Sequence, residues 1–113
     1  MARTQLISIL DTSSPDADEP SVPTIVQLTG EIDIFTSSAL RGQLLAALRH
    51  SSDLLILDLS GLVFCDSSGL GVLVGVQRRA RSMGITLALS TPSPYMSALL
   101  RSTGLDRRFP MAS

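Results

Sequence analysis

The chain has 113 residues, which is enough for one folded domain and too few for a second. Hydrophobic residues make up 44% of it and charged residues 17%, which excludes a disordered chain, and the net charge of -1 offers no electrostatic footprint for nucleic acid or an anionic membrane. A single cysteine excludes an internal disulfide and a cysteine zinc cluster. We expect no metal and no cofactor. No apolar run approaches the ~20 residues of a membrane span, and we expect a cytoplasmic protein.

Two apolar segments begin the chain and are predicted to pair as antiparallel strands. Residues 5–10 form a short apolar run, and residues 24–29, rich in β-branched side chains, end at Gly30. The acidic residues 11–20 between them contain turn signals and no helix, which favours antiparallel pairing. Residues 36–50 follow with the apolar periodicity of a helix.

The next stretch predicts a buried strand followed by a helix. Residues 54–59 are a nearly unbroken apolar run, as expected for a strand covered on both faces of a parallel sheet. Ser67 or Ser68 is predicted to cap the following helix, because a hydroxyl oxygen accepts the free N–H groups of a first turn. That helix end also attracts a phosphate. Gly84 is expected to end the helix, since glycine tolerates a positive φ.

The last third of the chain predicts one more crossover. Residues 85–90 form a strand candidate, and Ser93 with Pro94 marks the start of a helix that ends near Gly104. Residues 107–111 are a candidate for a final edge strand. The order of these elements predicts a single α/β domain: a mixed sheet with an antiparallel first strand and with helices packed on it.

One motif resembles the signature of a known family. Asp-Ser-Ser-Gly-Leu-Gly-Val-Leu at residues 66–73, behind Leu-Asp-Leu-Ser at residues 57–60, is similar to the phosphorylation site of the bacterial anti-sigma factor antagonists of the STAS domain family. The resemblance covers about residues 22–109 and implies one STAS domain over residues 1–113. Family members usually continue into a last helix after the strand near Phe109, and we expect this helix to be missing here. An uncovered edge favours self-association, so a homodimer is among our expectations.

The resemblance implies a switch that works by binding, with no enzyme activity in this chain. Ser67, directly after the aspartate, would be the phosphate acceptor. A serine kinase that is also the anti-sigma factor would transfer the phosphate from ATP. The unphosphorylated protein would bind this kinase and release its sigma factor, and a phosphatase acting on phosphorylated Ser67 would reset the cycle.

Polar residues that follow the predicted strands are expected to gather at one rim of the sheet, where the carboxyl ends of parallel strands lie. A phosphate adds roughly -1.5 to -2 charges, so at this acidic rim it would repel an acidic partner or displace a close-fitting one. We expect this rim and one stripe of the following helix to contact the partner: Asp33, Asp66, Ser68, Gly69, Gly71, Gly75, Arg78 and Ser93.

Structural roles remain open for several of these residues. Gly71 and Gly75 share the stripe with Arg78, and each costs ~1 kcal/mol relative to alanine in a helix. The stripe is either a flat strip for a partner's backbone or a contact with a neighbouring loop of the same domain. The two serines could be helix caps alone, and Asp33 could cap its own loop. Asp58 is expected to be a structural hydrogen-bond acceptor and Cys65 a small buried residue.

Three other functions compete with this interpretation. The first is a STAS scaffold or sensor module that binds another signalling protein or a small ligand independently of Ser67. The second is a nucleotide or phosphate binder that uses the helix N-terminus near Ser67 and Gly69. The third is a serine hydrolase, which would need His50, the only histidine, as its base.

Overall fold

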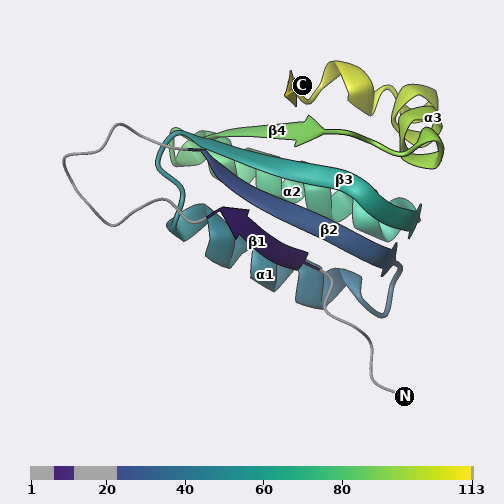
Figure 1. Cartoon of the computed structure of the whole chain (residues 1–113), viewed down its shortest axis with the longest axis horizontal. Coiled ribbons are helices and arrows are strands. Elements are labelled where there is room, and N and C mark those ends of the chain that lie inside the picture. Colours follow the sequence, from purple (N-terminus) through teal and green to yellow (C-terminus); the bar gives the residue numbers. More distant parts are fainter. Residues whose placement is uncertain (1–6, 12–22, 113) are drawn as a thin grey trace.

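Five strands stand side by side in chain order in the computed structural model, which describes residues 7–11 and 23–112 (Figure 1). The strands are β1 (Ile7–Asp11), β2 (Thr24–Ile32), β3 (Leu54–Cys65), β4 (Thr86–Ser90) and β5 (Met111–Ala112). The helices are α1 (Ser37–Arg49), α2 (Ser67–Ser82), α3 (Pro94–Thr103) and the short 3-10 helix η1 (Leu105–Arg107). None of the helices in this described part is long and apolar enough to cross a membrane.

The strand directions correct the predicted mixed sheet. The four strands β2, β3, β4 and β5 are all parallel to their neighbours, so the sheet that carries the helical crossovers is parallel throughout. Antiparallel pairing is confined to β1, which lies along the outer edge of β2 with Ile7 opposite Leu28 and Ile9 opposite Val26. The reason is that α1, α2 and α3 each return the chain to the same end of the sheet before the next strand begins.

The prediction that β3 is covered on both faces is wrong. Leu55, Leu57 and Leu59 are fully buried, whereas Leu54 and Ile56 between them are only partly buried. Strand order follows chain order, and right-handed crossovers between successive strands then place their helices on the same side. Accordingly α1 and α2 lie next to each other on one face of the sheet (Figure 1).

The sheet-facing side of α2 agrees with the prediction except at two residues. Its buried apolar residues include Leu70, Leu73, Val76 and Ala80. The helical period of the sequence predicts that Met83 lies on this side together with those four residues. Met83 is instead 38% exposed, and Gln77 is buried. Gln77 Nε2 donates to the Arg108 carbonyl at 2.8 Å, and Arg108 Nε donates to Gln77 Oε1 at 3.2 Å. This pair of hydrogen bonds ties the segment after η1 to α2.

The predicted helix ends are confirmed, and the predicted final strand is wrong in its position. Gly84 and Gly104 have φ angles of 75° and 77° after α2 and α3. Residues 105–107 form η1 in place of a strand, and the strand β5 begins only at Met111. Pro110 explains the late start, because proline has no N–H to donate to a strand partner.

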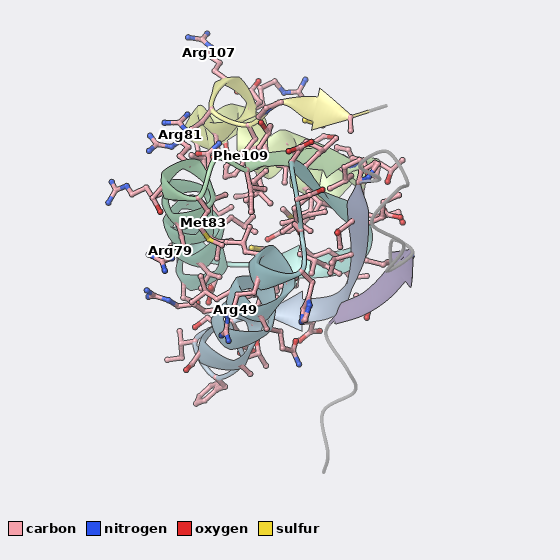
Figure 2. All side chains as sticks on the ribbon, turned by 90° about the vertical axis from the view of Figure 1, so that its left-hand side faces the viewer. Arg49, Arg79, Arg81, Met83, Arg107 and Phe109 are labelled. Carbon is pink, nitrogen blue, oxygen red and sulfur yellow. The ribbon has the colours of Figure 1, made fainter. Side chains whose placement is uncertain are left out.

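The two ends of the sheet differ in charge. The carboxyl ends of the central strands carry Glu31, Asp33 and Asp66, whereas the last turns of α1 and α2 carry Arg49, Arg79 and Arg81. Figure 2 faces this second end, where Arg79 and Arg81 extend away from α2 and Arg107 extends away from η1. Asp53, which directly precedes β3, lies at this second end as well. The net charge of -1 therefore conceals a local excess of negative charge at the rim that carries Glu31, Asp33 and Asp66.

Candidate functional site

Asp66 connects β3 to α2 and caps the helix. Its backbone is extended, with φ -102° and ψ -171°, and its Oδ1 accepts the amides of Ser68 at 2.9 Å and Gly69 at 3.3 Å. The Ser68 hydroxyl donates to the same oxygen at 2.5 Å. The prediction that Ser67 or Ser68 caps the helix is wrong, because the N-cap residue is Asp66. The aspartate takes the N-cap position because its charged oxygen accepts three hydrogen bonds there.

The two serines differ in accessibility and in bonding. Ser67 is exposed at the first helical position, and among the described residues its hydroxyl has no hydrogen bond. Ser68 is partly buried, and its hydroxyl is occupied by Asp66. An exposed hydroxyl without an internal partner can enter the active site of another protein, and a phosphate on it would remain near the positive end of the helix. These properties are found at Ser67 and are lacking at Ser68.

The hydrogen bond from the Ser68 hydroxyl, with smaller contributions from the backbone amides of Gly69 and Ser68, holds the pKa of Asp66 below its ordinary value. The folded protein therefore binds this proton less readily than the unfolded chain does. Stability from this interaction is present above the unfolded pKa and is lost as the pH falls through the lowered folded pKa.

We expect Asp66→Asn to make unfolding less dependent on pH in the acid range. At neutral pH the variant should unfold at a lower urea concentration than the wild type, because the charged cap is missing. At an acid pH below the lowered pKa of Asp66 the two midpoints should converge, because the carboxyl has then lost its charge. Urea denaturation at both pH values tests this, with Asp53→Asn, a loop residue before β3, as the control. A constant difference between the midpoints would contradict the prediction.

Asp33 lies at the carboxyl end of β2, on the same rim as Asp66. The Asp66 amide donates to the Ile32 carbonyl at 3.1 Å, which places the two strand ends side by side. Asp33 Oδ1 accepts the amides of Phe35 at 2.9 Å and Thr36 at 3.1 Å. Its interpretation as a cap of its own loop is confirmed, and its contact with a partner stays a prediction.

The three glycines of the predicted contact surface fall into two groups. Gly69 is buried, and a Cβ on it would lie 2.6 Å from Cys65 Sγ and 2.7 Å from Ile32 Cγ2. It allows α2 to approach the strand ends closely, so it supports the site from within. Gly71 and Gly75 are exposed, and no heavy atom among the described residues lies within 4 Å of a Cβ on either. The alternative that they pack against a loop of the described chain is therefore wrong.

Gly71, Gly75 and Arg78 form an open strip on the outer surface of α2, which we call the glycine strip. All three residues are exposed. The strip lies on the helix that begins at Ser67, and it is available for contact along two turns.

The start of α3 is fastened to the end of β3. The Ser93 hydroxyl donates to the Leu62 carbonyl at 3.3 Å and accepts the Met96 amide at 3.2 Å. The Tyr95 hydroxyl donates to the Cys65 carbonyl at 3.1 Å. Ser93 was predicted to contact a partner, and here its hydroxyl is used inside the domain as the cap of α3.

Five large apolar side chains around this rim are exposed, and sequence reasoning missed them. Their exposed fractions are 67% for Ile34, 80% for Phe35, 66% for Val63, 40% for Phe64 and 42% for Tyr95. The rings of Phe64 and Tyr95 stack with centroids 6.1 Å apart. We call these five residues the apolar rim. The signal in the sequence is a pair of adjacent apolar residues near the end of each strand, Ile34-Phe35 just after β2 and Val63-Phe64 within the last residues of β3. Alternation of side chains allows at most one residue of such a pair to be buried.

Two further residues have structural roles, as predicted. Asp58 Oδ1 accepts the Thr91 hydroxyl at 2.6 Å and the Ser60 amide at 2.9 Å. Cys65 is buried, and burial, together with the charge of Asp66, raises the pKa of its thiol to about 11. The thiol is therefore protonated and unreactive at neutral pH.

The described residues offer little for the competing chemistries. They contain no group of three or more His, Cys, Asp or Glu side chains that could hold a metal ion. His50 follows the last residue of α1, at the end of the sheet opposite Ser67 (Figure 1), so it is not placed to serve as a base for that serine. The histidine that a serine hydrolase would need is absent from the site.

Comparison with known proteins shows that most of the chain is similar to proteins of one family. A family model described as "Mlab, STAS domain" matches residues 16–112. The chain is similar to the anti-sigma F factor antagonist of Paenibacillus polymyxa, with 36% identity over 88 residues that cover 77% of this chain and 75% of the relative. It is also similar to the anti-sigma-B factor antagonist of Bacillus subtilis (strain 168), with 35% identity over 80 residues, 71% of this chain and 72% of the relative.

The fold is also similar to that of a solved structure. The crystal structure of an anti-sigma factor antagonist from Mycobacterium paratuberculosis is similar with a TM-score of 0.71 and 28% sequence identity. The match covers 93% of this chain and 84% of that one.

Proposed function

The chain belongs to the STAS domain family, and from this membership we propose that it acts as an anti-sigma factor antagonist. In its unphosphorylated form it binds an anti-sigma factor that is also a serine kinase, and this binding frees a sigma factor. Phosphorylation of Ser67 ends the binding, and a phosphatase restores it. The protein acts by binding and catalyses no reaction, and it works in the cytoplasm as one STAS domain over residues 1–113. Formation of a homodimer stays a prediction.

The observation that carries this proposal is the state of the Ser67 hydroxyl. It is exposed, it has no hydrogen bond among the described residues, and it stands at the first position of α2. The adjacent Asp66 takes over the capping role, so Ser67 can be modified without removing the helix cap. This arrangement supports a phosphate switch at the surface that leaves the fold intact.

The surroundings of Ser67 support a protein as its partner. The apolar rim offers Ile34, Phe35 and Val63 at more than half exposure, and exposed apolar patches of this kind mark interaction sites. Glu31 and Asp33 add negative charge at the same rim. The matching surface is apolar at its centre with basic residues around it, and it includes the kinase site that must reach the Ser67 oxygen. The glycine strip would let the partner's backbone approach α2.

We expect Phe35→Ala to weaken binding to the anti-sigma factor by about 2 kcal/mol, or roughly 30-fold, because exposed aromatic residues at the centre of an interface dominate its energy. The folded stability should change little, because this side chain is 80% exposed. Titration calorimetry with the purified partner measures the effect. Met83→Ala is the matched control, since Met83 is an exposed apolar residue at the opposite end of α2. Equal losses in both variants would argue against the apolar rim as the contact.

Mapping of the phosphorylation site tests the function itself. The protein is incubated with ATP and lysate from its source cells, and intact mass and site mapping follow. We expect one added phosphate, retained in Ser68→Ala and lost in Ser67→Ala. No added phosphate, with the lysate active on a control substrate, would favour a STAS module that binds its partner independently of Ser67.

A further inference from the structure

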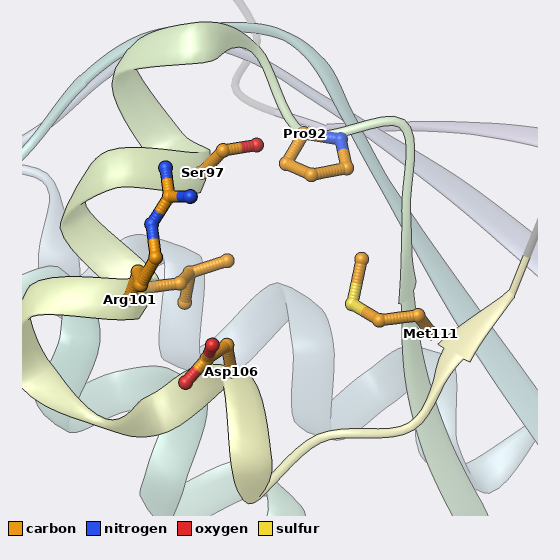
Figure 3. A pocket seen from close by; sticks show the side chains of 6 residues that line it. Pro92, Ser97, Arg101, Asp106 and Met111 are labelled. Atoms are coloured by element: carbon orange, nitrogen blue, oxygen red, sulfur yellow. The ribbon is translucent and has the colours of Figure 1, made fainter.

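A cavity of about 200 Å³ lies between α3, η1 and β5, and none of its lining residues belongs to the Ser67 site (Figure 3). Its polar residues, Ser97, Arg101 and Asp106, lie on one side, and Pro92 and Met111 lie on the other. Leu100 also lines it. Ligand cavities are usually larger, about 300–1,000 Å³, so the volume suits only a small molecule.

The two charged residues of this cavity are not neutralised. Arg101 stands in the last turn of α3 and Asp106 in the first turn of η1, and both side chains are exposed. Among the described residues neither forms an ion pair, with the other or with any third residue. Opposite charges that border one cavity without meeting leave room for a molecule that carries both charges and bridges them.

The other residues that line the cavity offer a hydroxyl group and an apolar surface. The Ser97 hydroxyl has no hydrogen bond among the described residues, so it can bond to a polar group of a ligand. Leu100 is only 2% exposed, and Met111 is 50% exposed on the opposite side. With Pro92 they give the cavity an apolar wall that an aliphatic group can cover.

We propose that this cavity binds a small zwitterion with an aliphatic group, of which an aliphatic α-amino acid is the simplest example. Its carboxylate would pair with the Arg101 guanidinium, whose fork geometry matches a carboxylate. Its ammonium group would pair with Asp106, and its aliphatic part would cover Leu100 and Met111. A carboxylic acid or an amine alone leaves one of the two charges unmatched. This site goes beyond the switch at Ser67 and needs no phosphate.

Methyl NMR on the full chain tests the proposal, with L-leucine as the probe. Of the methionines labelled at their methyl carbon, Met111 lines the cavity, and Met83 lies at the arginine-rich end on α2. We expect the Met111 signal to shift and saturate, while the Met83 signal stays in place. The same titration with 4-methylvalerate, which lacks the amine, and with isoamylamine, which lacks the carboxylate, should give affinities at least ~10-fold weaker.

Variants assign the two charges. Arg101→Gln and Asp106→Asn should each weaken L-leucine binding at least ~10-fold, whereas the neighbouring Arg107→Gln should bind like the wild type. Circular dichroism confirms that each variant is folded. Ser67→Ala should also bind like the wild type, which separates this site from the proposed switch. The proposal is overturned if Met111 shows no saturable shift, if either analogue binds as well as L-leucine, or if Arg101→Gln has no effect.

Discussion

Phosphorylation of Ser67 is expected to weaken binding to the anti-sigma factor kinase by at least ~100-fold, which corresponds to about 2.7 kcal/mol. The phosphate adds roughly -1.5 to -2 charges to a residue that the proposed interface covers. Docking would have to remove water from this charge, and the apolar rim around it offers no cationic group in compensation. The loss should arise at the interface, because Ser67 is exposed and makes no hydrogen bond among the described residues that the phosphate could break.

Calorimetry with stoichiometrically phosphorylated protein measures this effect. Ser67→Ala should bind as tightly as the unmodified protein, since the hydroxyl has no internal role among the described residues. Ser82→Glu adds a negative charge to an exposed residue at the far end of α2 and should change the affinity little. Thermal unfolding of the phosphoprotein should resemble that of the unmodified form. A large loss of thermal stability would show that the switch refolds the domain.

Gly69→Ala is expected to destabilise the fold by about 1–3 kcal/mol, the usual cost of an extra methyl group in a tightly packed core. The new Cβ would lie 2.6 Å from Cys65 Sγ and 2.7 Å from Ile32 Cγ2, so α2 must move away from the strand ends. For a domain of this size the melting temperature should fall by roughly 4–8 °C for each kcal/mol. Urea denaturation gives the free energy of unfolding directly.

Gly71→Ala is the matched control, two residues further along the same helix. Nothing among the described residues lies within 4 Å of its new methyl group, so the helix should gain up to ~1 kcal/mol from the better propensity of alanine. Opposite signs for the two variants are therefore expected, and a loss of equal size in both would refute the assignment of Gly69 to the packed core. If the glycine strip contacts the partner, Gly71→Ala should fold more stably and yet bind more weakly.

The local signals of the sequence were sufficient for most helix ends. Ser93 before Pro94, and glycine at residues 84 and 104, act within one turn of the chain, so the residue types alone determine the geometry. The same holds for the buried side of α2, except at Met83 and Gln77. Gln77 is buried because Arg108, 31 residues away, forms hydrogen bonds with both the nitrogen and the oxygen of its side-chain amide. The apolar periodicity of the sequence gives no indication of this contact.

The candidate site was predicted in its location and not in its details. Strand ends gather at one rim by topology alone, so Asp33, Asp66 and Ser67 could be placed together from the sequence. The identity of the cap, Asp66, could not be predicted from the sequence. Aspartate and serine are equally good N-caps, and only the backbone conformation determines which residue stands at that position. Phe35 lies in the turn between β2 and α1, and its exposure could not be predicted because apolar residues are ordinarily assigned to the core.

Glu31, Asp33 and Asp66 give the rim around Ser67 a local negative potential that the net charge of -1 does not reveal. A partner with a basic face would be turned toward the Ser67 rim while still in solution, which speeds association and makes the rate fall with added salt. Phosphate on Ser67 adds to this local negative potential. It would therefore hasten the encounter with such a partner even as it weakens the docked complex. The loss of affinity must then lie in faster dissociation.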